Sequence, residues 1–479
     1  MRLGALIGNS AGTAADAPVT GFAIDHRKVA PDSIFGAFRG ARVNGEDYIA
    51  AAIAAGAIAV VARPEADVTG AVHVADPEPR RAFAKLAARF FAPFPETCVA
   101  VTGTNGKTST VELARQLWHM AGNAAASVGT LGVTTGQDRV TTGLTTPDIV
   151  TFLANMSGLA REGITHAAFE ASSHGLDQYR TEGLRVAAGA FTNLSRDHLD
   201  YHGTMEAYLA AKLRLASEVV ADDGALVVWA DDPASAAFVD AARARGLNLV
   251  RVGMAGKELR LVSRTPTKFG QTLVVEGFGL NAAIDLPLIG AYQAANALVA
   301  AALVIATGGE PRATLAALGR VQPVPGRLER AAIARSGAPI YVDYAHTPDA
   351  IAAALDALRP HARGRLIVVI GAGGDRDAGK RPEMGRIAST KAEVVIVTDD
   401  NPRGEDPATI RAAVLADAPG AREIGDRRDA IAAAIAEAGP DDIVCIAGKG
   451  HEQGQIVGAG DAVRVIPFDD VAVARECAA

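Results

Sequence analysis

Short runs of β-branched residues alternate with alanine- and leucine-rich stretches along most of the chain, and this alternation limits the folds it can adopt. The runs 56–62 and 98–102 have the composition of buried strands, whereas 83–91 has that of a helix that ends before Pro93. Strands that alternate with helices are typical of βαβ units, in which helices cover a mostly parallel sheet. The pattern therefore predicts the α/β fold class.

The length of 479 residues favours about three domains. Two proline-containing segments, 93–95 and 322–326, mark natural boundaries between them. The last segment has four strand-like runs separated by Ala-rich helices, which is the pattern of a small doubly wound sheet. These runs are 340–342, 366–370, 394–397 and 443–446. We therefore expect domains at 1–95, 96–326 and 327–479.

The composition excludes several classes of function. The net charge is −7, which leaves no electrostatic footprint for nucleic acid or for an acidic membrane surface. The three cysteines lie far apart without C-x-x-C spacing, so they form neither a zinc site nor a redox pair and are typical of a reducing compartment. The first apolar stretch is too short for a secretory signal. We expect a cytoplasmic protein and a monomer.

The strongest motif reads T-G-T-N-G-K-T and lies between a predicted strand and a predicted helix. Small residues there let backbone N–H groups surround phosphates at a helix N-terminus, while the lysine adds a charge and a hydroxyl can bind Mg²⁺. Val101 stands where the full phosphate-loop pattern has its first glycine. The motif predicts ATP binding by Gly103, Thr104, Asn105, Gly106, Lys107, Thr108 and Ser109.

Two other clusters carry ionisable residues. Glu170 follows an apolar run, and an acid at the carboxyl end of a strand in a phosphate-binding domain can hold Mg²⁺. A surface glutamate at a strand end explains the same residue equally well. His198 lies in the segment T-N-L-S-R-D-H-L-D-Y-H-G, and taken alone it is better explained as a helix cap or another structural residue than as a metal ligand.

Together these motifs resemble the Mur ligase family, ATP-dependent enzymes that join an amino acid or peptide to a carboxylate. Folylpolyglutamate synthases share a similar phosphate loop, but the resemblance to Mur ligases extends through at least six separated motifs. It implies a central P-loop ATPase-like parallel sheet, flanked by an N-terminal uridine-binding α/β domain and a C-terminal Rossmann-like domain. The implied cofactors are ATP and Mg²⁺.

The resemblance also implies catalytic and nucleotide-binding roles. In the family, the lysine that corresponds to Lys212 is carbamylated and helps to hold a second Mg²⁺, whereas the residue alone also fits a solvated helix lysine. Gln293 stands where the family usually has asparagine. The implied catalytic residues are Lys107, Glu170, His198 and Lys212; the implied metal ligands are Thr108, Glu170, His198 and Lys212; the further ATP contacts are Asn296, Arg327 and Asp343.

By the same resemblance, one group of residues holds UDP-N-acetylmuramoyl-L-Ala-D-Glu. Arg180 suits a carboxylate or phosphate, because a guanidinium binds either group with two parallel hydrogen bonds. His26, in the uridine-type domain, stands where the family more often has serine. The implied contacts are His26, Thr145, Thr146, Ser172, Gln178 and Arg180.

A second group is implied to bind the incoming amine. The motif D-N-P-R is the form associated with meso-diaminopimelate, whose distal carboxylate Arg403 or Arg376 could bind, while Glu452 pairs with the distal ammonium. The Asn-Pro pair also predicts a β-turn, which is compatible with this role. The group comprises Arg376, Asp400, Asn401, Pro402, Arg403, Gly448 and Glu452.

The resemblance thus implies a ligase of peptidoglycan precursor synthesis that adds meso-diaminopimelate to UDP-N-acetylmuramoyl-L-Ala-D-Glu through an acyl phosphate. Three alternatives remain. A lysine-adding member of the family is opposed by Arg403. A folylpolyglutamate synthase-like ligase would not explain the uridine-type domain. A non-catalytic ATP-binding scaffold would tolerate the loss of Glu170, His198 and Lys212, all of which are present.

Overall fold

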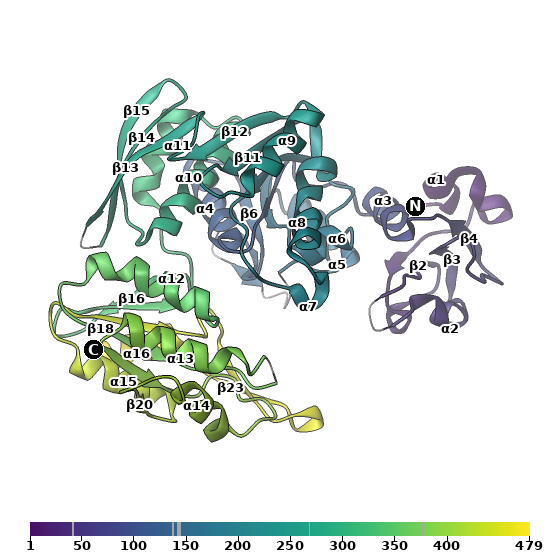
Figure 1. Cartoon of the computed structure of the whole chain (residues 1–479). Helices are drawn as coiled ribbons and strands as arrows, with labels where there is room; N and C mark the ends of the chain where they lie inside the picture. The colour runs from purple at the N-terminus through teal and green to yellow at the C-terminus, as the bar shows by residue number, and fades with distance from the viewer. Residues whose placement is uncertain (41–42, 137, 141–144, 268, 376) are drawn as a thin grey trace. The chain divides into compact units, whose positions relative to one another are not determined.

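The computed structural model describes the chain except for residues 41–42, 137, 141–144, 268 and 376 (Figure 1). The chain divides into two compact units. The first comprises Met1–Arg260 and Leu298–Thr314, and the second comprises Leu261–Ala297 and Leu315–Ala479. Both contain parallel sheets covered by helices, which confirms the α/β class. The boundaries after residues 95 and 326 remain a prediction.

The N-terminal part of the first unit is a four-stranded parallel sheet in the order β1-β2-β3-β4. The run predicted at 56–62 forms β3, and the predicted helix forms α3, which ends one residue before the cis Ala92–Pro93 bond. The strands are β1 (Gly21–Ala23), β2 (Ser33–Gly36), β3 (Ala57–Ala62) and β4 (Val72–Ala75); the helices are α1 (Leu3–Ile7), α2 (Ile49–Ala54) and α3 (Pro79–Phe91).

The central part of the first unit has the strand order β12-β11-β10-β5-β9-β6-β7-β8. From β12 to β6 neighbouring strands are parallel, so the loops that follow β5, β9 and β10 leave the same edge of the sheet. The strands are β5 (Thr97–Thr102), β6 (Ala125–Gly129), β7 (Gly132–Thr134), β8 (Arg139–Val140), β9 (His166–Glu170), β10 (Val186–Phe191), β11 (Val220–Trp229) and β12 (Asn248–Gly253).

Helices cover both faces of this sheet. Ser127 of β6 donates to Glu112 of α4 at 2.7 Å on one face, while on the other Phe152 of α5 packs edge-on against Phe169 of β9. The helices are α4 (Lys107–Met120), α5 (Ile149–Arg161), α6 (Ser173–Asp177), α7 (Leu199–His202), α8 (Met205–Arg214) and α9 (Ser235–Arg245).

The chain passes between the units three times: within β13 (Leu259–Thr267), within α10 (Ala291–Ala306) and after Thr314. Between β13 and α10, β14 (Gly270–Gly277) and β15 (Leu280–Leu286) form an antiparallel hairpin. Helix α11 (Pro311–Ala317) follows. The alternation of strands and helices did not predict this antiparallel segment.

The rest of the second unit is a doubly wound sheet in the order β16-β17-β21-β18-β19-β20. Its four predicted runs form β17, β18, β19 and β21. One apolar face packs against α12, α13 and α14, and the other against α15 and α16. The strands are β16 (Glu329–Ile333), β17 (Pro339–Asp343), β18 (Leu366–Ile370), β19 (Val394–Val397), β20 (Arg422–Glu423) and β21 (Ile443–Ala447). The helices are α12 (Pro348–Leu358), α13 (Lys380–Lys391), α14 (Pro407–Leu415), α15 (Arg427–Glu437) and α16 (Asp470–Ala478).

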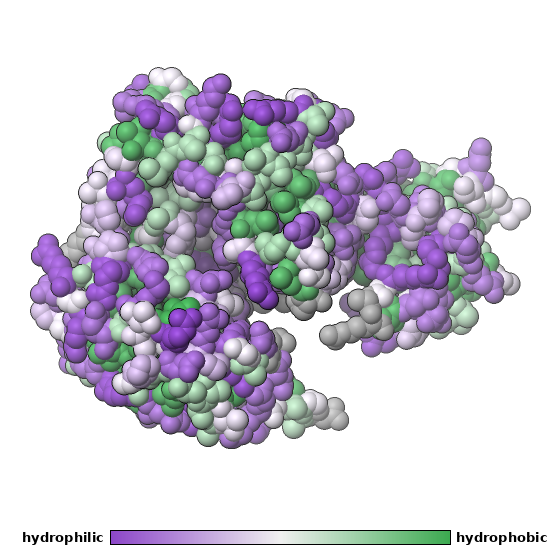
Figure 2. All heavy atoms as spheres, in the orientation of Figure 1, coloured by the Kyte–Doolittle hydropathy of each residue, from purple (hydrophilic) through white to green (hydrophobic). Residues whose placement is uncertain are grey.

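A separate antiparallel hairpin, β22 (Gly454–Val457) and β23 (Arg464–Pro467), follows β21. On the face seen in Figure 2, hydrophilic residues are spread over all parts of the chain, with smaller hydrophobic areas between them. None of the helices in the described part of the chain combines the length and the apolar character needed to span a bilayer.

Candidate active site

The phosphate loop between β5 and α4 is held by the segment that follows β10. The backbone N–H of Asn105 donates to Asn193 Oδ1 at 2.9 Å, and that of Thr104 donates to Asn193 O at 2.8 Å. Thr192 Oγ1 donates to Asn105 O at 2.6 Å. Gly103 and Gly106 have φ values of +148° and +86°, which favour glycine. Thr192 and Asn193 lie in the same motif as His198, and the sequence alone predicted no role for either residue.

Two predicted lysines meet at this loop. Nζ of Lys107 donates to Gly103 O at 2.9 Å and to Thr104 O at 2.8 Å, and Nζ of Lys212 donates to Gly103 O at 2.8 Å. Lys212 is only 1% exposed, so the solvated-lysine interpretation is wrong. Burial, together with the charge of Lys107, lowers the pKa of Lys212 well below its ordinary value. This shift disfavours the ammonium form of Lys212 relative to that of an exposed lysine.

Glu170 ends β9 at the same edge of the sheet and is 1% exposed. Its Oε1 accepts from Thr130 N at 2.7 Å and its Oε2 accepts from Thr130 Oγ1 at 3.3 Å. Glu170 is therefore a buried, oriented carboxylate, and the surface-glutamate interpretation is wrong. Thr130 also lies 3.0 Å from the hydroxyl of Thr145, a predicted substrate contact.

His198 occupies the N-cap position of α7 with a left-handed φ of +53°, but its side chain makes no capping hydrogen bond. Its Nε2 lies 3.4 Å from Asp197 Oδ2, and its ring packs edge-on against His174 at 4.9 Å between centroids. Across the ranges that the structure describes, no three His, Cys, Asp or Glu side chains gather into a metal-binding cluster.

The predicted substrate residues near α6 form one hydrogen-bonded network. Arg180 donates through Nη1 to Thr146 O at 2.9 Å and through Nη2 to Gln178 Oε1 at 2.8 Å. The backbone N–H of Ser172 donates to Thr146 Oγ1 at 3.1 Å, and Gln178 Nε2 donates to Tyr201 OH at 3.0 Å. The structure therefore brings these four predicted residues together and adds Tyr201, which sequence reasoning missed.

In the N-terminal sheet region, the ring of His26 stacks on Tyr48 with 4.4 Å between centroids and 10° between planes. Neighbouring Asp25 accepts two close hydrogen bonds from the guanidinium of Arg27, and these bonds lower the pKa of Asp25 to about 2. Tyr48 was not predicted, because nothing in its local sequence signals that it pairs with His26.

The three remaining predicted ATP contacts lie in the second unit. Gln293 donates to Arg327 O at 2.8 Å, and Asn296 donates to Gln293 Oε1 at 3.4 Å. Asp343 Oδ2 accepts from Leu328 N at 2.7 Å. Burial raises the pKa of Asp343 to about 6, although the charge of Arg327 opposes this shift. Gln293, which stands where asparagine was expected, links Arg327 to Asn296 through its buried amide.

The predicted amine-binding residues follow β19 and β21. Asn401 Nδ2 donates to Glu452 Oε2 at 2.8 Å, and Arg403 Nη1 donates to Gly374 O at 2.9 Å. Gly448 has a φ of +123°, and a Cβ there would come within 2.5 Å of Asp400 Oδ2. Pro402 is buried beside Asn401. The segments after β19 and β21 thus contact each other, while Arg376 lies outside the described residues.

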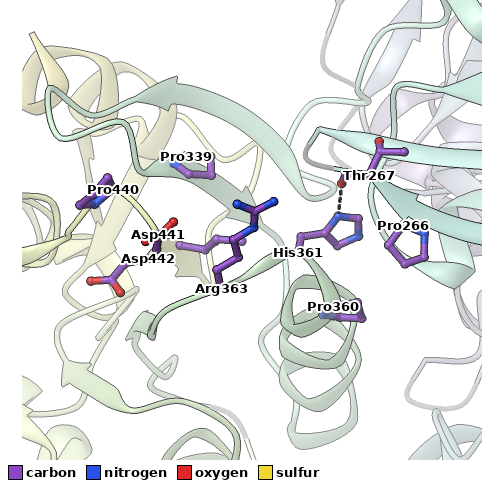
Figure 3. Close-up of a pocket in the computed structure, with 10 residues that line it drawn as sticks. Pro266, Thr267, Pro339, Pro360, His361, Arg363, Pro440, Asp441 and Asp442 are labelled. Atoms are coloured by element: carbon purple, nitrogen blue, oxygen red, sulfur yellow. Dashed lines mark hydrogen bonds between the residues drawn. The ribbon is translucent and has the colours of Figure 1, made fainter.

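A cavity of about 290 Å³ lies elsewhere in the second unit, near the first residues of β17 and β21 (Figure 3). His361 lies at its wall and donates through Nδ1 to Thr267 O at 2.6 Å. Arg363 and Asp442 also line it. The cavity contains none of the predicted site residues.

Comparison with known proteins matches three family models in order along the chain. Residues 18–90 match the Mur ligase family catalytic domain, 101–304 the Mur ligase middle domain, and 326–450 the Mur ligase glutamate ligase domain. A curated relative from Zymomonas mobilis is 61% identical, and the match covers 96% of this chain and 95% of the relative. The chain belongs to the Mur ligase family. The prediction of an ATP-dependent ligase is thereby confirmed.

The Zymomonas relative is named UDP-N-acetylmuramoyl-L-alanyl-D-glutamate–2,6-diaminopimelate ligase. A solved structure of that name is 32% identical, with a TM-score of 0.75 over 100% of this chain and 98% of the other. A Mycobacterium tuberculosis folylpolyglutamate synthase, solved with ADP and AMPPCP, is 20% identical, with a TM-score of 0.62 over 78% of this chain and 92% of the other. The likeness to the synthase shows a shared fold.

Proposed function

We propose that this chain adds meso-diaminopimelate to UDP-N-acetylmuramoyl-L-Ala-D-Glu, at the expense of ATP, in peptidoglycan precursor synthesis. The observation that carries the proposal is the 61% identity to a 2,6-diaminopimelate ligase over 96% of the chain. The geometry supports it, because the backbone N–H of Arg403 donates to Ile456 O and Glu452 accepts from Asn401, so the loops that carry this guanidinium and this carboxylate are joined. These charges complement the distal carboxylate and ammonium of diaminopimelate.

The chemistry divides into two steps. In the first, the γ-carboxylate of D-glutamate attacks the γ-phosphate of ATP, which gives an acyl phosphate and ADP. In the second, the amine of diaminopimelate attacks the acyl carbon, and the C–O bond to phosphate breaks as the amide forms. Lys107 and the backbone N–H groups at the start of α4 would stabilise the negative charge on the phosphates.

The donor set near the phosphate loop fits Mg²⁺, which prefers oxygen ligands and retains several waters. Glu170 supplies a buried carboxylate and Thr108 a hydroxyl at the start of α4. We propose Thr108, Glu170, His198 and a modified Lys212 as its ligands. Bound Mg²⁺ would neutralise phosphate charge during transfer.

We propose that Lys212 is carbamylated. Its environment disfavours the ammonium form, and only the neutral amine reacts with CO₂ to form a C–N bond with release of one proton. The resulting carbamate would replace a buried cation with an anionic oxygen ligand. Labelling with ¹³CO₂ should give a carbamate ¹³C resonance that is absent from Lys212→Met. A fully active wild-type enzyme that lacks this resonance would contradict the assignment.

For the UDP-linked substrate, we propose His26, Thr145, Thr146, Ser172, Gln178 and Arg180 as contacts. The hydrogen bonds from Arg180 to Thr146 and Gln178 support this group, because they hold the guanidinium in one orientation beside the other proposed contacts. Burial also lowers the pKa of Arg180 from its ordinary value, so an anionic ligand there would offset part of the cost of burying this cation.

The proposed function is tested by phosphate release from ATP and UDP-N-acetylmuramoyl-L-Ala-D-Glu, with meso-diaminopimelate or L-lysine supplied in parallel. Release with diaminopimelate alone is expected. Phosphate release with lysine alone would be consistent with a Mur ligase that adds lysine, but it would contradict the role proposed for Arg403. Release with neither amine, from protein shown to bind ATP, would favour a folate substrate or the scaffold alternative.

A further inference from the structure

A buried lysine connects the two loops of the amine site. Lys449, in the loop after β21, has a side-chain exposure of 0%. Its Nζ donates to Asn401 Oδ1, after β19, and to Gly454 O, at 2.8 Å each. Asn401 Oδ1 also accepts from the backbone N–H of Ile456 at 2.9 Å. Two donors therefore point at the same amide oxygen and fix which way the amide faces.

This orientation determines what the other end of the amide can do. With its oxygen held by Lys449, Asn401 directs Nδ2 to Glu452 Oε2 at 2.8 Å. Asn401 is only 4% exposed, whereas the side chain of Glu452 is 32% exposed. Both the oxygen and the nitrogen of the Asn401 amide are thus hydrogen-bonded within the protein. Of Lys449, Asn401 and Glu452, it is Glu452 that a ligand can reach.

The electrostatic arrangement supports a role beyond packing. Nζ of Lys449 lies 3.6 Å from Glu452 Oε2 and 3.9 Å from Asp400 Oδ1, so one buried cation faces both carboxylates of the site. Burying an ammonium is costly unless it is paired and hydrogen-bonded. An apolar residue of similar length would avoid that cost but could not hold the amide of Asn401.

A second group, a buried ion pair, also connects the same two loops. Arg427 and Asp470 have side-chain exposures of 0% and form two hydrogen bonds of 2.8 Å. Arg427 also donates to Ala447 O at 3.1 Å and to Asp399 O at 3.4 Å. These carbonyls belong to the last residue of β21 and to the segment after β19. Lys449 therefore acts on loops whose backbones are already fixed to each other.

We propose that Lys449 is a positioning residue for the amine substrate: it fixes the Asn401 amide, which in turn orients the Glu452 carboxylate toward the ammonium group of that substrate. The inference rests on the proposed function and assigns a role to a residue that the motif around Gly448 and Glu452 left without one. Lys449 itself does not contact the reacting atoms.

The test compares Lys449→Met and Asn401→Asp with the wild type in steady-state kinetics. Lys449→Met keeps the apolar stem and removes the donor. Asn401→Asp can still accept from Lys449 and Ile456 but cannot donate to Glu452. Each variant should raise KM for diaminopimelate about 10- to 100-fold, with KM for ATP and for the UDP-linked substrate within twofold of wild type.

The matched control is Arg365→Met. It breaks the ion pair between Arg365 and Asp442, which precede β18 and β21 at the strand ends opposite the amine site. This variant should lower the thermal midpoint without changing any of the three KM values. If Lys449→Met does not fold, the KM of Asn401→Asp for diaminopimelate serves as the test. This variant is expected to fold, because it retains an acceptor for the buried lysine.

Unchanged KM for diaminopimelate in both site variants, or an equal rise in all three KM values, would overturn the role of Lys449. The wild-type reaction separates this inference from the proposed function. Failure of the wild type to ligate diaminopimelate would refute the function itself, whereas an active wild type with unaffected variants would refute the positioning role alone.

Discussion

Replacing Asp343 with asparagine should stabilise the second unit at neutral pH while impairing its use of ATP. The residue is 8% exposed, and burial raises the pKa of its carboxyl group from 3.8 to about 6. Above pH 6 the folded protein therefore contains a carboxylate that would be better solvated in the unfolded chain. The amide introduced by Asp343→Asn would keep an oxygen for the N–H of Leu328 and would carry no charge.

The size of the stability change, and the pH range over which it occurs, follow from the linkage between proton binding and folding. A rise of the folded-state pKa to about 6 corresponds to about 3 kcal/mol, which favours the folded state when Asp343 is protonated. This contribution is fully present below pH 3.8 and is lost as the pH rises through about 6. The stability difference between Asp343→Asn and the wild type should therefore increase in favour of the variant by about 2 kcal/mol between pH 4 and pH 7.

Hydrogen exchange along a urea titration, followed on peptides from β17 and β21, measures the unfolding of this unit. Tryptophan fluorescence would not do so, because Trp118 and Trp229 belong to the first unit. In parallel, kcat/KM for ATP should fall in the variant. A stability difference that does not change with pH would refute the assignment of a raised pKa to Asp343.

Three further outcomes follow from the site. Lys107→Ala should reduce ATP-dependent phosphate release about 10²- to 10³-fold, since it removes a charge from the phosphate loop; activity within twofold of wild type would contradict this role. Gly103→Ala should abolish ATP binding in calorimetry without global unfolding, because the new Cβ would collide with Thr192 Oγ1; retained affinity would show that the loop tolerates the shift. In the native protein at pH 8, iodoacetamide should modify Cys477 and leave Cys98, whose pKa burial raises to about 12; mass mapping that finds Cys98 modified first would contradict that burial.

The strands of the parallel sheets could be predicted because buried parallel strands are nearly continuous apolar runs. The run 366–370 matches β18 residue for residue. The antiparallel hairpin β14–β15 was not predicted, since its alternating burial leaves a weaker signal in the sequence than a fully buried strand does.

Candidate residues within a contiguous motif could likewise be predicted from the sequence, whereas their hydrogen-bond partners elsewhere in the chain could not. The residues 103–109 could be proposed from one loop, but Glu170 accepts a hydrogen bond from Thr130, which is 40 positions away. Lys449 contacts Asn401 across 48 positions, and a lysine between two glycines gives no indication that it is buried. Pairings of this kind are set by strand order and loop packing, which short motifs do not encode.

The central claim is tested most directly by a competition reaction. The protein is given ATP, Mg²⁺ and UDP-N-acetylmuramoyl-L-Ala-D-Glu with equal concentrations of meso-diaminopimelate and L-lysine, and the tripeptide product is identified by mass spectrometry. The account predicts that the diaminopimelate product predominates by at least about tenfold, as expected when Arg403 pairs with a carboxylate that lysine lacks. A predominance of the lysine product, or no tripeptide at all, would contradict it.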